Sequence, residues 1–435
     1  MFIFYCPRRL NEVEMEKIGR KKIHGHLDIT QLSTFSKEDL IDKIIALQCH
    51  NVELKNIIAK SQQRNQKRSY PPQKPFDFTR CKFRHVLLQV LYLGWDYQGY
   101  ACQEDSLNTI EHFLFEALLK TCLIKDRQSS NYHRCGRTDK GVSAFGQVIS
   151  LDLRSNNHDL DREINYCIIL NKVLPPAIRC VAWCPVSDNF SARFNCTLRK
   201  YKYFFPKGFL NIQKMVEGTQ FLVGSHDFRN FCKMDVGNGV VKYNRTITHV
   251  DILPYSLNKE NEEYSMFVLV IQGQAFLWHQ IRCIMGVLLL IGQEKEDPSI
   301  VKDLLDVEKH SRKPDYNMAS DIPLNLYDCE YELESNWRYD DNNLTDLIKK
   351  LQSFWTFHAI KANMVESMLL DLRKRSGSTV DLSLCQSNYL LNGVRAKKYV
   401  PLVQRQKCES LENRIQHFIK RRKLEGSNSS PVVDT

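Results

Sequence analysis

The chain has 435 residues, of which 43% are apolar and 26% charged, a composition typical of a globular protein and not of a fibrous or disordered one. Its 61 lysines and arginines outnumber its 50 aspartates and glutamates, which gives a net charge of +11. This excess favours a polyanionic partner, because each phosphate that a cation neutralises releases counterions. A basic protein without such a partner is the alternative.

Cysteine usage and hydropathy restrict the class of protein further. The sequence contains 15 cysteines, but it is long and shows no signal-peptide pattern after the apolar segment Met1–Cys6. No Cys-x-x-Cys pair occurs, and the closest approach is Cys180 with Cys184. We therefore expect reduced thiols in the core of an intracellular protein, and no zinc site. The longest apolar run, Ile284–Ile291, is too short to span a bilayer and predicts a soluble protein.

The segment before the globular body is predicted to contain one helix. Residues 1–35 are expected to form a disordered extension. Ser36–Lys60 begins with a capping-box pattern and continues with about three heptads, which predicts a helix. This helix either packs on its own domain or forms a short coiled coil in which Asn51 would fix the register. Residues 61–84 are basic and contain prolines, which predicts a linker that is either a solvated tether or an arm contacting phosphates.

The body is expected to consist of two units. The first, residues 85–188, is predicted to contain two strands and a capped helix: Val86–Leu93, a helix beginning at Asn108 and Glu111, and Gln147–Leu153. The second, residues 189–337, is predicted to contain two strands and a helix: Leu198–Phe205, Tyr264–Gly273 and a helix from about Trp278. Strands and helices without a regular βαβ rhythm favour an α+β fold over a doubly wound sheet.

The carboxyl-terminal part is predicted to be helical and then unstructured. Residues 338–405 are polar and favour a helical extension, and residues 406–435 form a basic tail. The cluster Lys420–Lys423 in this tail is either a nuclear localisation signal or a solvated run of charge. We expect the protein in the nucleus, the cytoplasm or both.

The densest set of chemically capable residues is the segment Arg137–Ala144, which follows Gly136. It places one acid, Asp139, between two cations and two glycines. Glycines let the backbone bend tightly, and an acid flanked by cations suits a nucleophile or base beside a phosphate backbone. Composition alone favours the alternative, a charged turn between two elements of secondary structure.

This loop is one of five sequence blocks that follow one another between about Val86 and Tyr331. The other four are Leu93–Gln103, Phe190–Tyr203, Gly224–Phe231 and Phe276–Gly286. Together the five blocks resemble the TruA family of tRNA pseudouridine synthases. Five blocks in the order of the family make a chance match very rare.

Finer matches resemble one branch of this family. They are Tyr132–Cys135, Phe145–Leu151, Cys232–Val240, Pro323–Cys329 and Tyr399–Leu402. The helix predicted near the amino terminus fits the same branch. These segments are similar to the eukaryotic enzymes that modify positions 38 and 39 of the anticodon arm. A synthase of the same family that acts elsewhere in tRNA is the nearest alternative.

The resemblance implies roles for individual residues. Asp139 corresponds to the essential carboxylate, acting either as a nucleophile or as a base. Arg282 would pair with this carboxylate and keep it ionised. Tyr201 would stack on the flipped uridine or take the proton from carbon 5, and Arg137 would fill the gap that the uridine leaves. The substrate-binding set expected on this basis is Arg137, Lys140, Arg193 and Tyr201.

The resemblance also implies a fold and partners. We expect two α/β subdomains, each with an antiparallel sheet, joined into one central sheet with the site in a cleft across its face. The substrate would be tRNA, bound by a homodimer, and the isomerisation would need no cofactor, metal or membrane. A non-catalytic tRNA-binding or tRNA-folding protein on the same scaffold is a further alternative. Retention of Arg137, Asp139, Tyr201 and Arg282 argues against it.

Overall fold

The computed structural model describes residues 76–427, except 105, 157–158, 235, 237–239, 241, 260, 335, 377–384 and 394–397. Residues 77–435 form one compact unit. The predicted extension 1–35, the predicted helix Ser36–Lys60 and most of the linker 61–84 lie outside the described residues. Within the described residues, no helix is both long enough and apolar enough to cross a membrane.

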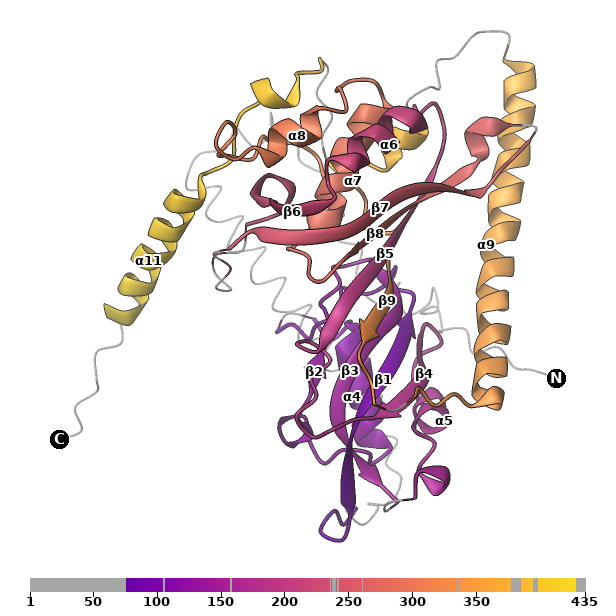
Figure 1. The fold of residues 1–435 in the computed structure, drawn as a ribbon. Helices are drawn as coiled ribbons and strands as arrows, with labels where there is room; N and C mark the ends of the chain where they lie inside the picture. Colours follow the sequence, from indigo (N-terminus) through magenta and orange to yellow (C-terminus); the bar gives the residue numbers. More distant parts are fainter. Residues whose placement is uncertain are drawn as a thin grey trace, which may run out of the picture. The chain divides into compact units, whose positions relative to one another are not determined.

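A single mixed sheet organises the described chain (Figure 1). Its strands are β1 Lys82–Tyr92, β2 His133–Arg134, β3 Ser143–Ser155, β4 Ile178–Pro185, β5 Cys196–Pro206, β6 Gly224–Asp227, β7 Asn244–Ser256, β8 Met266–Gly273 and β9 Leu324–Tyr331. The strand order is β4-β1-β3-β9-β5-β8-β7-β6, with β2 paired to β3. Neighbours are antiparallel except for β3 and β9, which pair in parallel. This large, mostly antiparallel sheet with helices confirms the predicted mixture of strands and helices.

The first strand starts earlier than the sequence pattern predicts. β1 begins at Lys82, inside the predicted linker, because Lys82 pairs with Ser155 of β3. Within β3, the polar residue Ser150 is fully buried. Its hydroxyl accepts a hydrogen bond from the backbone N–H of Ala192 at 3.1 Å, which satisfies the buried polar group.

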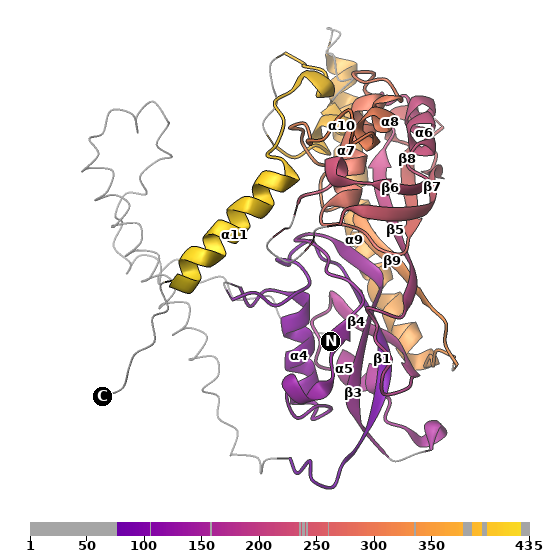
Figure 2. The same ribbon diagram turned by 60° about the vertical axis from the view of Figure 1, so that its left-hand side comes forward.

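The described residues also form helices. They are α4 Ile110–Lys120, α5 Tyr166–Asn171, α6 Ile212–Gln220, α7 Gln280–Gly292, α8 Ile300–Leu305, α9 Asp341–Arg375, α10 Cys385–Tyr389 and α11 Leu411–Ser427. Figure 2 shows α4 beside β1 and β3, and α6, α7 and α8 grouped near β7 and β8. Every residue of α7 is buried, because this helix packs in the centre of the second half of the unit. Burial on all sides explains the nearly continuous apolar run of its sequence.

The cap of α4 differs from the prediction. Thr109, and not Asn108, is the N-cap residue, and its hydroxyl accepts a hydrogen bond from the N–H of His112 at 3.3 Å. Asn108 instead donates its side-chain amide to the carbonyl of Asp96. Glu111 is buried and forms ion pairs with two arginines, so it serves tertiary packing rather than a capping box.

The carboxyl-terminal helices partly match the prediction. α9 packs its first turns on β4 through Leu347, and its far end reaches the β7–β8 connection through an ion pair between Arg373 and Glu263 (Figure 1). α11 lies where the sequence predicts an unstructured tail. It forms because Leu411 is buried, and Ile415 and Phe418 pack against the core.

Candidate active site

The loop that carries Asp139 connects β2 to β3 and is held by hydrogen bonds on both sides. Thr138 shares a 2.8 Å hydrogen bond with the phenol of Tyr92, a fully buried residue of β1. The side-chain amide of Gln147 donates to the carbonyl of Gly136 at 2.9 Å. The N–H of Val142 donates to the carbonyl of Asp139 at 3.2 Å, which closes a tight turn. The loop is therefore a fixed platform for its acid.

Two glycines allow the loop to approach the segment that follows β1. A Cβ atom on Gly94 would lie 1.9 Å from the carbonyl oxygen of Val142. Gly99 has a φ of +104°, and a Cβ atom there would lie 3.2 Å from the carbonyl oxygen of Thr138. Only glycine allows this conformation and this contact at low cost. The block Leu93–Gln103 therefore acts by positioning the backbone of the acidic loop.

Three side chains from the start of α7 surround the carboxylate of Asp139. The indole Nε1 of Trp278 donates a hydrogen bond to Oδ1 at 3.1 Å. Nε2 of His279 lies 3.4 Å from Oδ2, and the Arg282 guanidinium lies 3.6 Å from the same oxygen. The side chain of Asp139 remains 23% exposed, so it is both oriented and accessible. Sequence reasoning predicted the pairing with Arg282, and the structure brings the two residues together.

Arg282 is shared between two carboxylates. Its side chain is only 6% exposed and also lies 3.6 Å from Oδ1 of Asp321. Its Nε donates to the carbonyl of Ala319 at 2.9 Å, and the N–H of Ala319 donates back to the carbonyl of Arg282. These contacts fix the plane of the guanidinium, so it can face Asp139 without reorganisation.

His279 occupies a strained position at the N-cap of α7. Its φ of 61° and ψ of 10° lie in the left-handed region, which costs a non-glycine residue of the order of 1–3 kcal/mol. Strain of this kind gathers at functional sites, where the surroundings enforce it. Burial lowers the pKa of His279 below its ordinary value, an effect that the nearby Asp139 opposes and Arg282 reinforces. A neutral imidazole therefore faces the carboxylate at neutral pH.

Tyr201 lies on β5 and reaches the site through a neighbouring aromatic ring. It is 9% exposed and packs edge-to-face against Phe276 with ring centroids 5.3 Å apart. Phe276 lies two residues before Trp278, on the segment that leads into α7. Burial raises the pKa of Tyr201 well above its ordinary value, so its phenol keeps its proton.

The cations of the predicted substrate-binding set lie at the surface. Arg137, Lys140 and Arg193 are all exposed. Sequence reasoning did not select Lys233. This residue adds a cation near the site, since its Nζ lies 4.3 Å from the ring centre of Trp278. Lys233 thus adds positive charge beside a side chain that contacts the carboxylate, where a phosphate backbone would be attracted.

The histidine and aspartate at the end of β6 form a local structure. His226 forms a hydrogen bond with the carbonyl of Val223 at 3.0 Å. Asp227 forms an ion pair with Arg229 at 2.7 Å and accepts its backbone N–H. Both residues therefore stabilise a turn.

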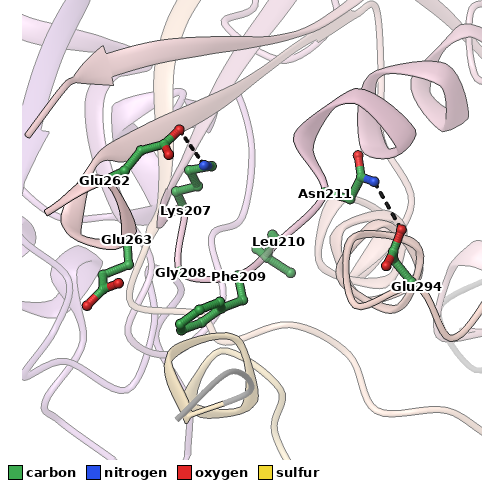
Figure 3. Close-up of a pocket in the computed structure, with 8 residues that line it drawn as sticks. All are labelled: Lys207, Gly208, Phe209, Leu210, Asn211, Glu262, Glu263 and Glu294. Carbon is green, nitrogen blue, oxygen red and sulfur yellow. Dashed lines mark hydrogen bonds and ion pairs between the residues drawn. The ribbon is translucent and has the colours of Figure 1, made fainter. Parts of the chain in front are cut away.

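One described pocket is unrelated to these residues. It has a volume of about 320 Å³ and is drawn in Figure 3. Its lining includes the acids Glu262, Glu263 and Glu294, and Glu262 pairs with Lys207. Glu263 pairs with Arg373 and Glu294 with Lys214, so the charges of these acids are compensated.

Comparisons with known proteins agree with this geometry. A family model described as tRNA pseudouridine synthase matches residues 219–332. A bovine relative named tRNA pseudouridine(38/39) synthase is 46% identical, with 81% of this chain and 80% of that protein covered. The human protein of the same name is 46% identical over 80% of each chain, and the yeast one 38% identical over 87% and 90%. This chain belongs to the tRNA pseudouridine synthase family, which confirms the resemblance drawn from the sequence.

Several site residues escaped sequence reasoning. Trp278 and His279 stand in a recognised block, but no role was assigned to them. Asp321 was not selected, because it lies 182 positions from Asp139 and nothing in its local sequence marks it. The three-dimensional contact through Arg282 is what identifies it.

Proposed function

We propose that this protein isomerises uridine to pseudouridine in the anticodon stem-loop of tRNA, at positions 38 and 39. The observation that carries the proposal is the carboxylate of Asp139, held by Trp278, His279 and Arg282 and still open to solvent. The names of the mammalian and yeast relatives support the choice of substrate and positions.

The reaction exchanges one bond to the base for another. The bond between the ribose and N1 breaks, the base turns, and a new bond forms between the ribose and carbon 5, which then loses its proton. The uridine must first leave its stack, at a cost of a few kcal/mol. Asp139 acts as the nucleophile or the base, and the Arg282 guanidinium lies 3.6 Å from its carboxylate. The proposed reaction uses no cofactor and no catalytic metal.

Tyr201 suits stacking on the base better than removal of the proton from carbon 5. A phenol whose pKa is raised by burial holds its own proton and is therefore a poor base. The ring of Tyr201 would still stack on the base, because aromatic rings stack on any pyrimidine. Arg137, Lys140 and Arg193 would contribute contacts to the RNA from the exposed border of the site.

We also propose a homodimer, with two α/β subdomains in each chain and α9 at the dimer interface. Large apolar side chains on α9 are exposed, among them Trp355 at 72%, Ile360 at 57% and Met364 at 55%. Exposed apolar surface of this extent typically marks an interaction site. In sedimentation experiments, Trp355→Glu with Met364→Glu should produce monomers, whereas the control Lys349→Glu should not.

The location of the protein is a separate proposal. Modification of tRNA occurs in the nucleus and the cytoplasm, and we propose one or both as its compartment. Fluorescence microscopy of the tagged full chain, with and without the Lys420–Lys423 cluster, tests the contribution of that cluster.

The decisive experiment uses unmodified tRNA transcripts that carry uridine at position 38 or 39. Pseudouridine is mapped by chemical labelling and primer extension after incubation with the purified full chain. We expect conversion at these positions, and none with Asp139→Ala. Binding of tRNA by Asp139→Ala should remain within a few-fold, because phosphate contacts supply most of the affinity.

Other outcomes would replace the proposal. Conversion only at other positions would retain the reaction and discard positions 38 and 39. Binding without any conversion would favour a tRNA-binding or tRNA-folding protein. Equal loss of binding and activity in Asp139→Ala would make Asp139 a structural residue.

A further inference from the structure

Three cysteines from distant parts of the sequence meet inside the unit. Cys135 precedes the acidic loop, Cys196 begins β5, and Cys329 lies on β9. Their exposed fractions are 3%, 3% and 6%, and the three Sγ atoms all lie within 4.8 Å of one another. Sequence reasoning missed this cluster, because gaps of 61 and 133 residues separate its members.

A buried cation accompanies the three sulfurs. Arg199 on β5 is 8% exposed, and its guanidinium donates hydrogen bonds to the carbonyls of Gln274, Cys135 and Arg193. Within the described part of the chain, no carboxylate forms an ion pair with it. The ionisable groups that act on it most strongly include all three thiols. An arginine is always charged, and a buried charge is costly unless an opposite charge lies near it.

We propose that Cys135, Cys196 and Cys329 form a binding site for a thiophilic metal ion, Zn²⁺ or Cu⁺. Soft thiolate ligands select these ions. Binding would replace the three S–H protons, which leave to solvent, by three metal–sulfur bonds, with no change of oxidation state. Three thiolates and Zn²⁺ carry a net charge of −1, which the charge of Arg199 would neutralise.

The separations of the sulfurs are compatible with this use after a small adjustment. Three sulfurs at about 2.3 Å from one ion lie about 3.8–4.0 Å from each other in tetrahedral or trigonal geometry. The sulfurs of Cys135 and Cys329 are 3.3 Å apart, so they would separate by about half an ångström. Zn²⁺ would need a fourth donor beside the three thiolates, whereas Cu⁺ is satisfied by three thiolates.

An ion here would join three segments of the site's scaffold. Cys135 lies four residues before Asp139, and Cys329 lies eight residues after Asp321. Metal–sulfur bonds would tie the start of the acidic loop to β5 and β9. The role is structural, in keeping with a reaction that needs no catalytic metal.

The test measures metal bound to the full chain, independently of its activity. Protein produced with zinc or with copper under reducing conditions is dialysed, and its metal content is determined by mass spectrometry. Each of Cys196→Ser and Cys329→Ser is compared with Cys167→Ser. Cys167 is the matched control, because it is buried and its Sγ lies 3.0 Å from that of Cys180, but it has no third sulfur.

We expect about one ion for each chain in the wild type and in Cys167→Ser, and a loss of most of the bound metal in the other two variants. The metal that is retained decides between Zn²⁺ and Cu⁺. X-ray absorption on the wild type needs no variant to fold and should give three sulfur neighbours at about 2.3 Å. Equal metal content in all variants, no metal in the wild type, or a disulfide between Cys135 and Cys329 in reduced preparations would overturn the proposal.

Discussion

Replacing Arg282 by methionine tests the electrostatic core of the site. The change removes the guanidinium charge that lies 3.6 Å from Asp139 and from Asp321 but keeps a side chain of similar length. With an effective dielectric constant of about 20, a charge pair at this separation is worth about 4.6 kcal/mol. Asp139 is 23% exposed, so solvent screening reduces this to about 2–3 kcal/mol. If all of this free energy stabilises the transition state, its loss lowers the rate of isomerisation by about 30- to 150-fold.

A single-turnover assay measures this loss directly. Enzyme in excess is mixed with tRNA that carries tritium on carbon 5 of the target uridine, and the release of tritium follows the chemical step. Binding of tRNA should change little, because Arg282 is buried and phosphate contacts supply most of the affinity. Asp321→Asn serves as the control. It leaves Arg282 paired with Asp139 and anchored to Ala319, so we expect a rate within about threefold of wild type.

The result that would refute this reasoning is a folded Arg282→Met variant with a rate within about threefold of wild type. Asp139 would then be held in its active form by Trp278 and His279 alone. A large loss in Asp321→Asn as well would mean that both carboxylates, and not Asp139 alone, are needed for the reaction.

Two further predictions concern the backbone and pH. Gly141 has a φ of +78° and a Cβ atom there would lie 2.2 Å from Oδ2 of Asp321, so Gly141→Ala should lower the free energy of unfolding by about 2 kcal/mol or more in urea titrations. Gly136→Ala is its control and should change that free energy by less than about 1 kcal/mol, because a Cβ atom there meets nothing within 4 Å. Because burial lowers the pKa of His279 from its ordinary 6.5, the unfolded chain binds this proton more readily. Stability from this group should be full above about pH 6.5 and fall below it, and His279→Gln should flatten the fall in unfolding midpoints measured at about pH 7.5 and about pH 5.5. An equally steep fall in that variant would assign the pH dependence to other groups.

The sequence was sufficient for the parts of the site that lie in recognisable blocks. Asp139 and Arg282 were paired on the basis of resemblance, and the distance between them agrees. The strand predicted at Leu198–Phe205 corresponds to β5, and the helix predicted from about Trp278 corresponds to α7. Both predicted starts lie within a few residues of the observed ones. Prediction from the local sequence succeeds here because the spacing of apolar residues distinguishes strands from helices.

Features that depend on distant contacts could not be predicted in this way. Asp321 and the cysteines Cys135, Cys196 and Cys329 meet only because strands far apart in the sequence become neighbours in the sheet. The tail offers a second example, since α11 owes its helical form to packing and not to its polar composition. Tertiary contacts override local preference in both cases.

The parallel pairing of β3 with β9 has a consequence for the time at which activity arises. β3 directly follows the acidic loop. It pairs with β9 through only two residue pairs, Ser143 with Asn325 and Ala144 with Leu326. β9 begins 169 positions after the end of β3, so this pair of strands forms after most of the body has been synthesised. Pairing across such a separation is slow, because the entropy cost of closing the loop comes before the stabilising contacts between the strands. A nascent chain can therefore bury much of its first half before β9 and the nearby Asp321 join the site, so the complete site forms only after most of the body has been made.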